Sequence, residues 1–180
     1  MSINKKIFIA LDTNDINKAL DLVEQTKDFI AGIKIGLQFY LANGKEGIKK
    51  LEKFPNLKIF LDLKLHDISN TVFQAIKSLS DLKIDFLTIH SLGSLEMCLA
   101  ANKAVKEFNP KINLLAVTVL TSMDDDDVKS TSNFQSSEEQ VKKLAMIAKN
   151  SGLNGVIASG RDIKMIRSLI GKEMKIFCPG

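Results

Sequence analysis

Residues 60–71 read Phe60-Leu61-Asp62-Leu63-Lys64-Leu65-His66-Asp67-Ile68-Ser69-Asn70-Thr71, and no other stretch of the chain says as much about the fold. Leu61, Leu63 and Leu65 alternate with charged residues, which is the period of a strand with one apolar face. Asp62 and Lys64 then share the other face, and Asp67 follows where the strand gives way to a loop. Buried charges are costly unless they are paired, so this pattern favours a reaction centre, with a structural ion pair as the alternative.

Strand-like and helix-like segments alternate along the whole chain. Strands are expected at residues 7–12, 32–36, 58–64, 85–90, 113–120, 155–159 and 175–178. Helices are expected at 15–29, near 39–53, at 72–79, from a Ser94 cap through 108, from a capping box at 137–140 to 152, and at 163–170. A βα unit repeated every 25 to 30 residues or so predicts a parallel sheet, either a barrel or a doubly wound sheet.

The ends of the predicted strands favour the barrel. Five strands finish with polar or ionisable residues: Asp12, Lys34, Asp62 with Lys64, His90, and Thr118 with Thr121. In a (β/α)8 barrel all these ends open onto one mouth, whereas a doubly wound sheet concentrates its site at one switch point. The first βα turn, residues 12–15, has no glycine and is a poor dinucleotide loop.

We therefore expect an α/β fold, a (β/α)8 TIM barrel, forming one domain over residues 1–180. Only about seven βα units can be counted, whereas a complete barrel has eight. The sequence stops at Gly180, at the end of the seventh predicted strand, so the last helix, strand and helix are expected to be missing.

Composition narrows the function classes. The chain has 180 residues, 45% of them hydrophobic, and a net charge of +4 carried almost entirely by lysine. Basic residues form no dense block interleaved with aromatic ones, so nucleic acid is not an expected partner. The apolar run 7–11 is too short for a signal peptide or a membrane span, so neither export nor a membrane is expected. Cys98 and Cys178 are expected to be reduced thiols of a cytoplasmic protein.

Other polar residues are weaker candidates. His66 adjoins the motif where the strand ends, and we interpret it as structural, while a hydrogen-bonded framework role is favoured for His90. The acidic run 124–127 lacks the ligand spacing of a cation site and is expected to be a solvated loop. The polar segment 123–136 that contains it could act as a lid.

The Asp-x-Lys-x-x-Asp pattern of Asp62, Lys64 and Asp67, continued to Thr71, closely resembles the orotidine 5'-phosphate decarboxylase family. Further motifs fall in the family's order over essentially the whole chain. They are Ala10-Leu11-Asp12, Ile33-Lys34-Ile35-Gly36, Leu115 to Ser122, Gly152 to Val156, and Pro179-Gly180. The resemblance implies a (β/α)8 barrel that works as a homodimer with active sites at the subunit interface.

The activity implied by the resemblance is that of a carboxy-lyase. It converts orotidine 5'-phosphate to uridine 5'-phosphate (UMP) and carbon dioxide in pyrimidine biosynthesis, with neither a metal nor an organic cofactor. Carried over by position, Lys34, Asp62 and Lys64 form a charged array in which Lys64 is the general acid. Asp67 and Thr71 reach into the partner's site. Asp12 would contact the ribose and Thr121 the pyrimidine.

The sequence departs from the family pattern in three places. Ser69 stands where proline is usual, which should loosen the loop that carries Asp67. Ala158 replaces a common cysteine. The family's phosphate-binding residues follow the seventh and eighth strands, beyond Gly180, so the chain by itself is expected to be weakly active or inactive.

Two alternatives stay open. The first is a metal-dependent sugar-phosphate decarboxylase or aldolase of the same barrel type. Those related families place a metal-binding acid where this chain has Lys34, which argues against them. The second is a non-catalytic truncated barrel, which the retention of every charged motif residue opposes.

Overall fold

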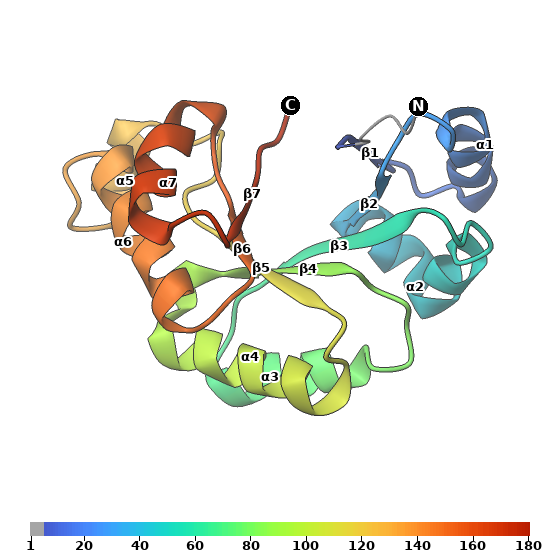
Figure 1. Cartoon of the computed structure of the whole chain (residues 1–180), viewed down its shortest axis with the longest axis horizontal. Coiled ribbons are helices and arrows are strands. Elements are labelled where there is room, and N and C mark those ends of the chain that lie inside the picture. The colour runs from blue at the N-terminus through green and yellow to red at the C-terminus, as the bar shows by residue number, and fades with distance from the viewer. Residues whose placement is uncertain (1–5) are drawn as a thin grey trace. The chain divides into compact units, whose positions relative to one another are not determined.

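A computed structural model of the chain describes residues 6–180, in which strands and helices alternate (Figure 1). The strands are β1 (Phe8–Ala10), β2 (Gly32–Gly36), β3 (Lys58–Leu65), β4 (Phe86–His90), β5 (Asn113–Val117), β6 (Gly155–Ile157) and β7 (Lys175–Phe177). The α-helices are α1 (Ile16–Thr26), α2 (Leu37–Leu51), α3 (Ser69–Ser78), α4 (Leu95–Phe108), α5 (Asp125–Thr131), α6 (Ser137–Asn150) and α7 (Ile163–Ile170). Two short 3-10 helices, η1 (Ser91–Gly93) and η2 (Gly160–Asp162), follow β4 and β6.

The order of the strands in the sheet is their order in the sequence, from β1 to β7. Pairing is parallel between β1 and β2, β2 and β3, β5 and β6, and β6 and β7. Sequential parallel strands joined by helices are the arrangement that βα repeats build in barrels. The contacts divide the chain into two compact units. The first comprises the residues up to Leu63 together with Leu79–Leu87, and the second comprises Lys64–Ser78 and Thr88–Gly180.

The first unit contains β1, β2, most of β3 and the helices α1 and α2. Asp15 caps α1 by accepting hydrogen bonds from the amides of Asn17 and Lys18. Helix α2 is interrupted at Gly44, whose φ of 57° suits a residue without a side chain. Ile33, Ile35 and Leu61 are fully buried on the outward face of the strands. The inner face carries the residues that matter for function.

The second unit contains the end of β3, the end of β4 and all elements from α3 onward except the segment 79–87. Helix α3 packs against α4, and α6 packs against α7, as Figure 1 shows. Ser94 caps α4 by accepting a hydrogen bond from the amide of Met97, as the sequence predicts. Strand β5 ends at Val117, three residues before the predicted end.

Two local predictions near α6 are wrong. The cap of α6 is Ser136 rather than Ser137, and Ser137 instead donates two hydrogen bonds to the carboxylate of Asp125. The acidic run 124–127 is not a loop, because Asp124 and Asp127 form a capping box that begins α5. Aspartates stabilise a helix N-terminus through its orphan amides and dipole, which explains the correction.

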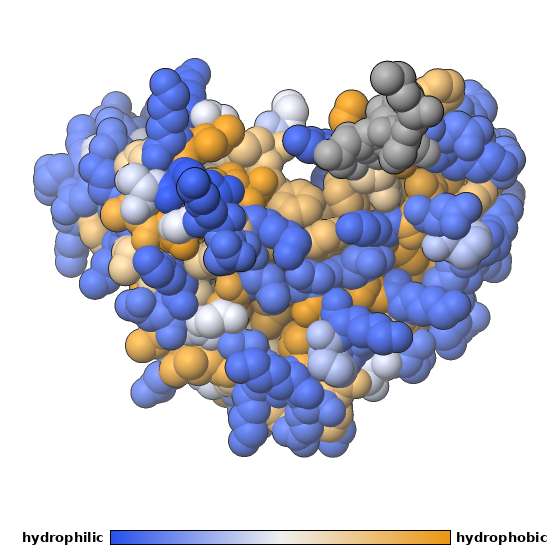
Figure 2. Space-filling model, viewed as in Figure 1, coloured by the Kyte–Doolittle hydropathy of each residue, from blue (hydrophilic) through white to orange (hydrophobic). Residues whose placement is uncertain are grey.

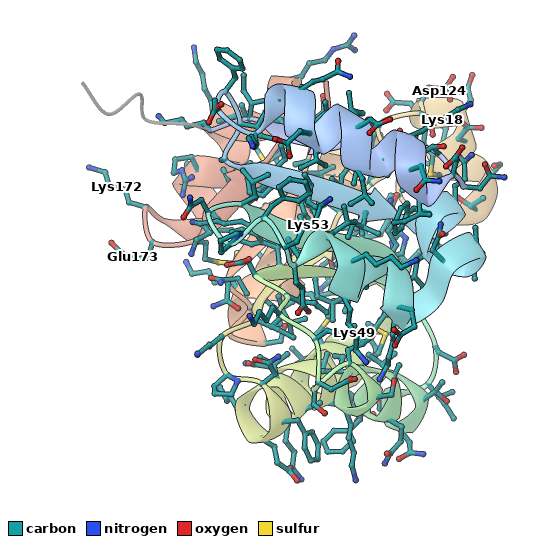
Figure 3. All side chains as sticks on the ribbon, turned by 90° about the vertical axis from the view of Figure 1, so that its right-hand side faces the viewer. Lys18, Lys49, Lys53, Asp124, Lys172 and Glu173 are labelled. Carbon is teal, nitrogen blue, oxygen red and sulfur yellow. The ribbon has the colours of Figure 1, made fainter. Side chains whose placement is uncertain are left out.

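Hydrophilic side chains gather over the helices on the face drawn in Figure 2, with apolar side chains showing between them. Lys18, Lys49 and Lys53, which Figure 3 labels, lie on or directly after α1 and α2 and are exposed. Solvated helix faces thus hold much of the positive charge in the first unit. None of the helices within residues 6–180 has the length and apolar character needed to cross a membrane.

Candidate active site

Three phenylalanine rings form an apolar floor on the inner face of the first unit. Phe8, Phe60 and Phe86 meet edge to face, with ring centroids 5.7–6.1 Å apart. Gly32 leaves room for this floor, because a Cβ there would lie 2.5 Å from the Phe8 ring and 2.3 Å from the carbonyl oxygen of Lys58. By strand parity, the residue that follows Phe60 on this face of β3 is Asp62.

Asp62 and Lys34 form an ion pair next to this floor. Lys34 pairs with Phe60 in the register of β2 and β3, and its Nζ lies 3.5 Å from Oδ2 of Asp62. The Asp62 residue is only 8% exposed, and the Lys34 side chain is 30% exposed. A carboxylate this deeply buried requires a cation beside it, and Lys34 supplies one.

Asp12 follows β1 on the same side of the first unit. The register of β1 and β2 places Ala10 opposite Lys34, and the amide of Leu11 donates to the Lys34 carbonyl. A Cβ at Gly36 would lie 3.7 Å from Oδ1 of Asp12, so this carboxylate sits beside the end of β2. Asp12 itself is exposed, which leaves its carboxylate open to a ligand.

Lys64 belongs to the second unit and has an unusual backbone. It is the second residue after Asp62 on β3, and its φ is 49°, in the left-handed region. Its amide donates a hydrogen bond of 2.9 Å to Oγ1 of Thr88 on β4, and Thr88 is fully buried. Residues other than glycine seldom adopt this conformation, and when they do they cluster at functional sites.

Asp67 lies beside an open pocket of about 520 Å³ in the second unit. The pocket is lined by His66, Asp67, Ile68, Ser69, Gly93, Ser94 and Glu96. The Asp67 carboxylate accepts a hydrogen bond from the amide of Ile68 and is exposed, and the ring of His66 packs on His90 with centroids 5.3 Å apart. The acid therefore faces open space on the surface of this unit.

The remaining predicted contacts, Thr71 and Thr121, are both exposed. Thr71 lies in the first turn of α3, and Thr121 follows β5 in the segment that leads to α5. Of the predicted residues, the structure brings Lys34 and Asp62 into contact and places Asp12 beside β2 in the first unit. Lys64, Asp67, Thr71 and Thr121 belong to the second unit.

Sequence reasoning missed two buried hydroxyl groups of the second unit, those of Thr88 and Ser91. Thr88 bonds to Lys64, and Ser91 donates to the carbonyl of Val117 at the end of β5. A signal for Thr88 exists, because it shares strand parity with Phe86 and His90 on the inner face of β4. Ser91 lies beyond β4, where no periodicity marks it.

Groups with metal-binding chemistry do not gather in the part of the chain that the structure describes. Within residues 6–180, no three His, Cys, Asp or Glu side chains are grouped so that they could hold a metal ion. Both cysteines are free thiols, and burial raises the pKa of Cys98 to about 11.

Sequential βα units with charged residues on one face of β2 and β3 define a barrel-type α/β protein with an electrostatic site. Residues 5–180 match the family described as orotidine 5'-phosphate decarboxylase / HUMPS. The chain belongs to this family.

Individual relatives agree with the family. The chain is 41% identical over 177 residues to the orotidine 5'-phosphate decarboxylase of Fusobacterium nucleatum, covering 98% of this chain and 74% of that one. The crystal structure of orotidine 5'-phosphate decarboxylase from Lactobacillus acidophilus is similar with a TM-score of 0.88, at 34% identity, over 98% of this chain and 81% of that chain. The enzyme of Methanocaldococcus jannaschii, solved with the inhibitor BMP, has a TM-score of 0.81 at 25% identity, over 98% of this chain and 78% of that chain.

Proposed function

We propose that this protein is an orotidine 5'-phosphate decarboxylase, a carboxy-lyase that produces UMP in the cytoplasm. The observation that carries the proposal is the ion pair of Lys34 with the buried Asp62, on the strand that brings Lys64 two residues later. The match of residues 5–180 to the family supports it. The Asp-x-Lys-x-x-Asp pattern is intact, and each of its three members is a residue that the chemistry needs.

The reaction breaks the bond between C6 of the pyrimidine and its carboxylate carbon. Carbon dioxide leaves, and the electron pair stays on C6 in the plane of the ring, where delocalisation is poor. The barrier is therefore electrostatic, and a cation held beside C6 lowers it. In this proposal the Lys64 ammonium stabilises the developing carbanion and then gives it a proton, so that UMP and a neutral amine result.

Asp62 has two effects in this scheme. Its negative charge keeps Lys64 protonated, and it stands near the substrate carboxylate, so that like-charge repulsion is relieved as carbon dioxide leaves. Lys34 neutralises Asp62 from the other side, so that charges of alternating sign coexist in a dry site. Asp12 is assigned to the ribose and Thr121 to the pyrimidine, while Thr71, like Asp67, is assigned to the substrate site of the partner subunit.

Asp67 is assigned to the site of a second subunit in a homodimer. The surface around it suits such a partner, since Ile68 lines the same pocket and is 71% exposed, and Leu92 and Leu95, which flank Gly93 and Ser94 of its lining, are 53% and 43% exposed. Exposed apolar side chains that border a polar pocket are typical of protein interfaces. In a two-fold interface each subunit lends its Asp67 to the other.

The test is decarboxylation of orotidine 5'-phosphate by the purified full-length protein, with a chelator and no added metal. Formation of UMP under these conditions is the expected result. Activity that a chelator abolishes and magnesium restores would instead indicate the sugar-phosphate branch of the family. Binding of BMP, the inhibitor in the Methanocaldococcus jannaschii structure, provides a second measurement that does not require turnover.

A further inference from the structure

The hydrogen-bond direction along β3 changes at Lys64. In a parallel strand, successive amides alternate between the two neighbouring strands. The amide of Lys58 donates to Ala31, at the start of β2, and the amide of Ile59 donates to the Asp85 carboxylate, at the start of β4. Lys64 lies six positions after Lys58, so its amide should point toward β2, as the amide of Lys58 does. It bonds instead to the Thr88 hydroxyl of β4.

The backbone of Lys64 explains the change. Among residues 6–180, only Lys64 and Ser94 have a positive φ without being glycine. Ser94 is the cap of α4, and its hydroxyl accepts the amide of Met97, so a helix start accounts for its conformation. Lys64 lies within a strand and has no such local cause, and an L-residue keeps a left-handed φ only where its surroundings impose it.

Thr88 is positioned to hold Lys64 in its left-handed conformation. Its side chain is fully buried, so its position is fixed by β4, and its Oγ1 lies 2.9 Å from the amide nitrogen of Lys64. Both residues belong to the second unit. The φ angle of Lys64 sets the direction of its Cα–Cβ bond, so a contact that holds φ also aims the long side chain.

We propose that Thr88 is a positioning residue for Lys64: its buried hydroxyl holds the Lys64 amide and thereby keeps the ammonium group on the line that the reaction requires. The claim that Thr88 holds the Lys64 backbone rests on the geometry alone. The claim that this hold matters for catalysis rests on the proposed function. Thr88 touches no reacting atom in this scheme. A displacement of about 1 Å at a catalytic group can cost about a hundredfold in rate.

Thr88→Val tests the proposal, because valine keeps the shape and removes the acceptor. We expect the Lys64 amide to exchange with solvent about fivefold faster or more, since one hydrogen bond is lost. We expect kcat to fall by about a hundredfold while KM changes less than about threefold, because ground-state binding stays intact. Thr88→Ser retains the hydroxyl and should restore both the slow exchange and most of kcat.

Ser151→Ala provides the matched control. Ser151 is also buried in the second unit, and its hydroxyl donates to the carbonyl of Ile147 in α6, far along the chain from Lys64. This variant should lose stability without a specific loss of kcat. A loss of kcat in Ser151→Ala equal to that in Thr88→Val would reduce Thr88 to a general structural role and overturn the proposal.

Two further results would contradict it. Unchanged exchange of the Lys64 amide in Thr88→Val would show that the hydroxyl does not hold the backbone. Fast exchange with an unchanged kcat would show that this hydrogen bond is not needed for catalysis. A full-length wild-type protein that binds no BMP and forms no UMP would refute the proposed function instead. In that case the exchange measurement still decides whether Thr88 holds Lys64.

Discussion

The lysine in the middle of β2, Lys34, and the lysine near the end of β3, Lys64, are held in different ways. Lys34 sits in a regular paired strand, and its ammonium group is anchored by the buried Asp62 at 3.5 Å. Lys64 is anchored through its main chain, which leaves the extended conformation and bonds to Thr88. An ion pair neutralises a buried charge, whereas a hydrogen bond to the main chain constrains the direction in which a side chain leaves the strand. In the proposed scheme Lys34 is a partner in the charge array and Lys64 is the group that gives the proton.

The largest expected effect comes from removing the acting group. Lys64→Ala should abolish nearly all turnover of orotidine 5'-phosphate while keeping affinity for BMP, because only the transition-state charge loses its cation. The measurement is a pair of assays, steady-state kinetics and inhibitor binding. A variant that keeps more than a tenth of wild-type turnover has lost less than about 1.4 kcal/mol of barrier stabilisation, and Lys64 is then not the proton donor.

Asp67 extends the comparison to a second subunit. Lys64→Ala and Asp67→Ala proteins should each be nearly inactive, but unfolding and refolding them together should restore roughly a quarter of wild-type activity. Half of the dimers are then mixed, and each mixed dimer holds one intact site and one doubly damaged site. If mixed dimers form and activity stays absent, Asp67 serves its own subunit.

The ion pair of Lys34 with Asp62 should contribute to the free energy of unfolding. Lys34→Met removes a cation that pairs with a buried carboxylate and should lower the free energy of unfolding by about 1–3 kcal/mol in urea denaturation. Lys49→Met is the control, because Lys49 is exposed and its partners Glu46 and Asp81 are solvated, so stability should barely change. Equal stability of Lys34→Met and wild type would contradict the anchoring role.

The smallest expected effect concerns an exposed anchor between α5 and α6. The Asp125 carboxylate accepts hydrogen bonds of 2.7 Å from the amide and hydroxyl of Ser137, and these bonds lower its pKa below the ordinary 3.8. A carboxyl whose pKa is lowered on folding stabilises the fold above its unfolded-state pKa, and that stabilisation is lost as the pH falls through the folded-state pKa.

Asp125→Asn should therefore lower the melting temperature slightly at pH 7, and the gap to wild type should close in strong acid, well below pH 3.8. Asp126→Asn is the matched control, since its carboxylate accepts a hydrogen bond from the exposed Lys129 in the same helix rather than from α6. A gap that is unchanged in strong acid would exclude Asp125 as its source.

Local patterns predicted much of this fold. Alternating leucines place β3 to within a residue, β2 has the predicted bounds, and the Ser94 cap begins α4 as expected. Helix α5 was missed because four consecutive aspartates suggest a solvated loop, although two of them satisfy helix amides. The division of the contacts into two compact units does not test the prediction of a single domain.

The candidate site was predictable in its residues and not in its geometry. Asp62 and Lys64 follow from strand parity, but the left-handed φ of Lys64 depends on Thr88, 24 positions further along the chain. No periodicity within one strand carries such information. The cap at Ser136 was missed for a similar reason, because the Asp125 carboxylate occupies Ser137.

The most direct test of the account is the decarboxylation of orotidine 5'-phosphate in heavy water with a chelator present. Because a lysine ammonium exchanges its protons with solvent, the account predicts UMP that carries deuterium at C6 from the wild-type protein. Lys64→Ala should produce almost no UMP. The absence of UMP from the full-length wild-type protein, or deuterated UMP formed equally fast by its Lys64→Ala variant, would contradict the role assigned to Lys64.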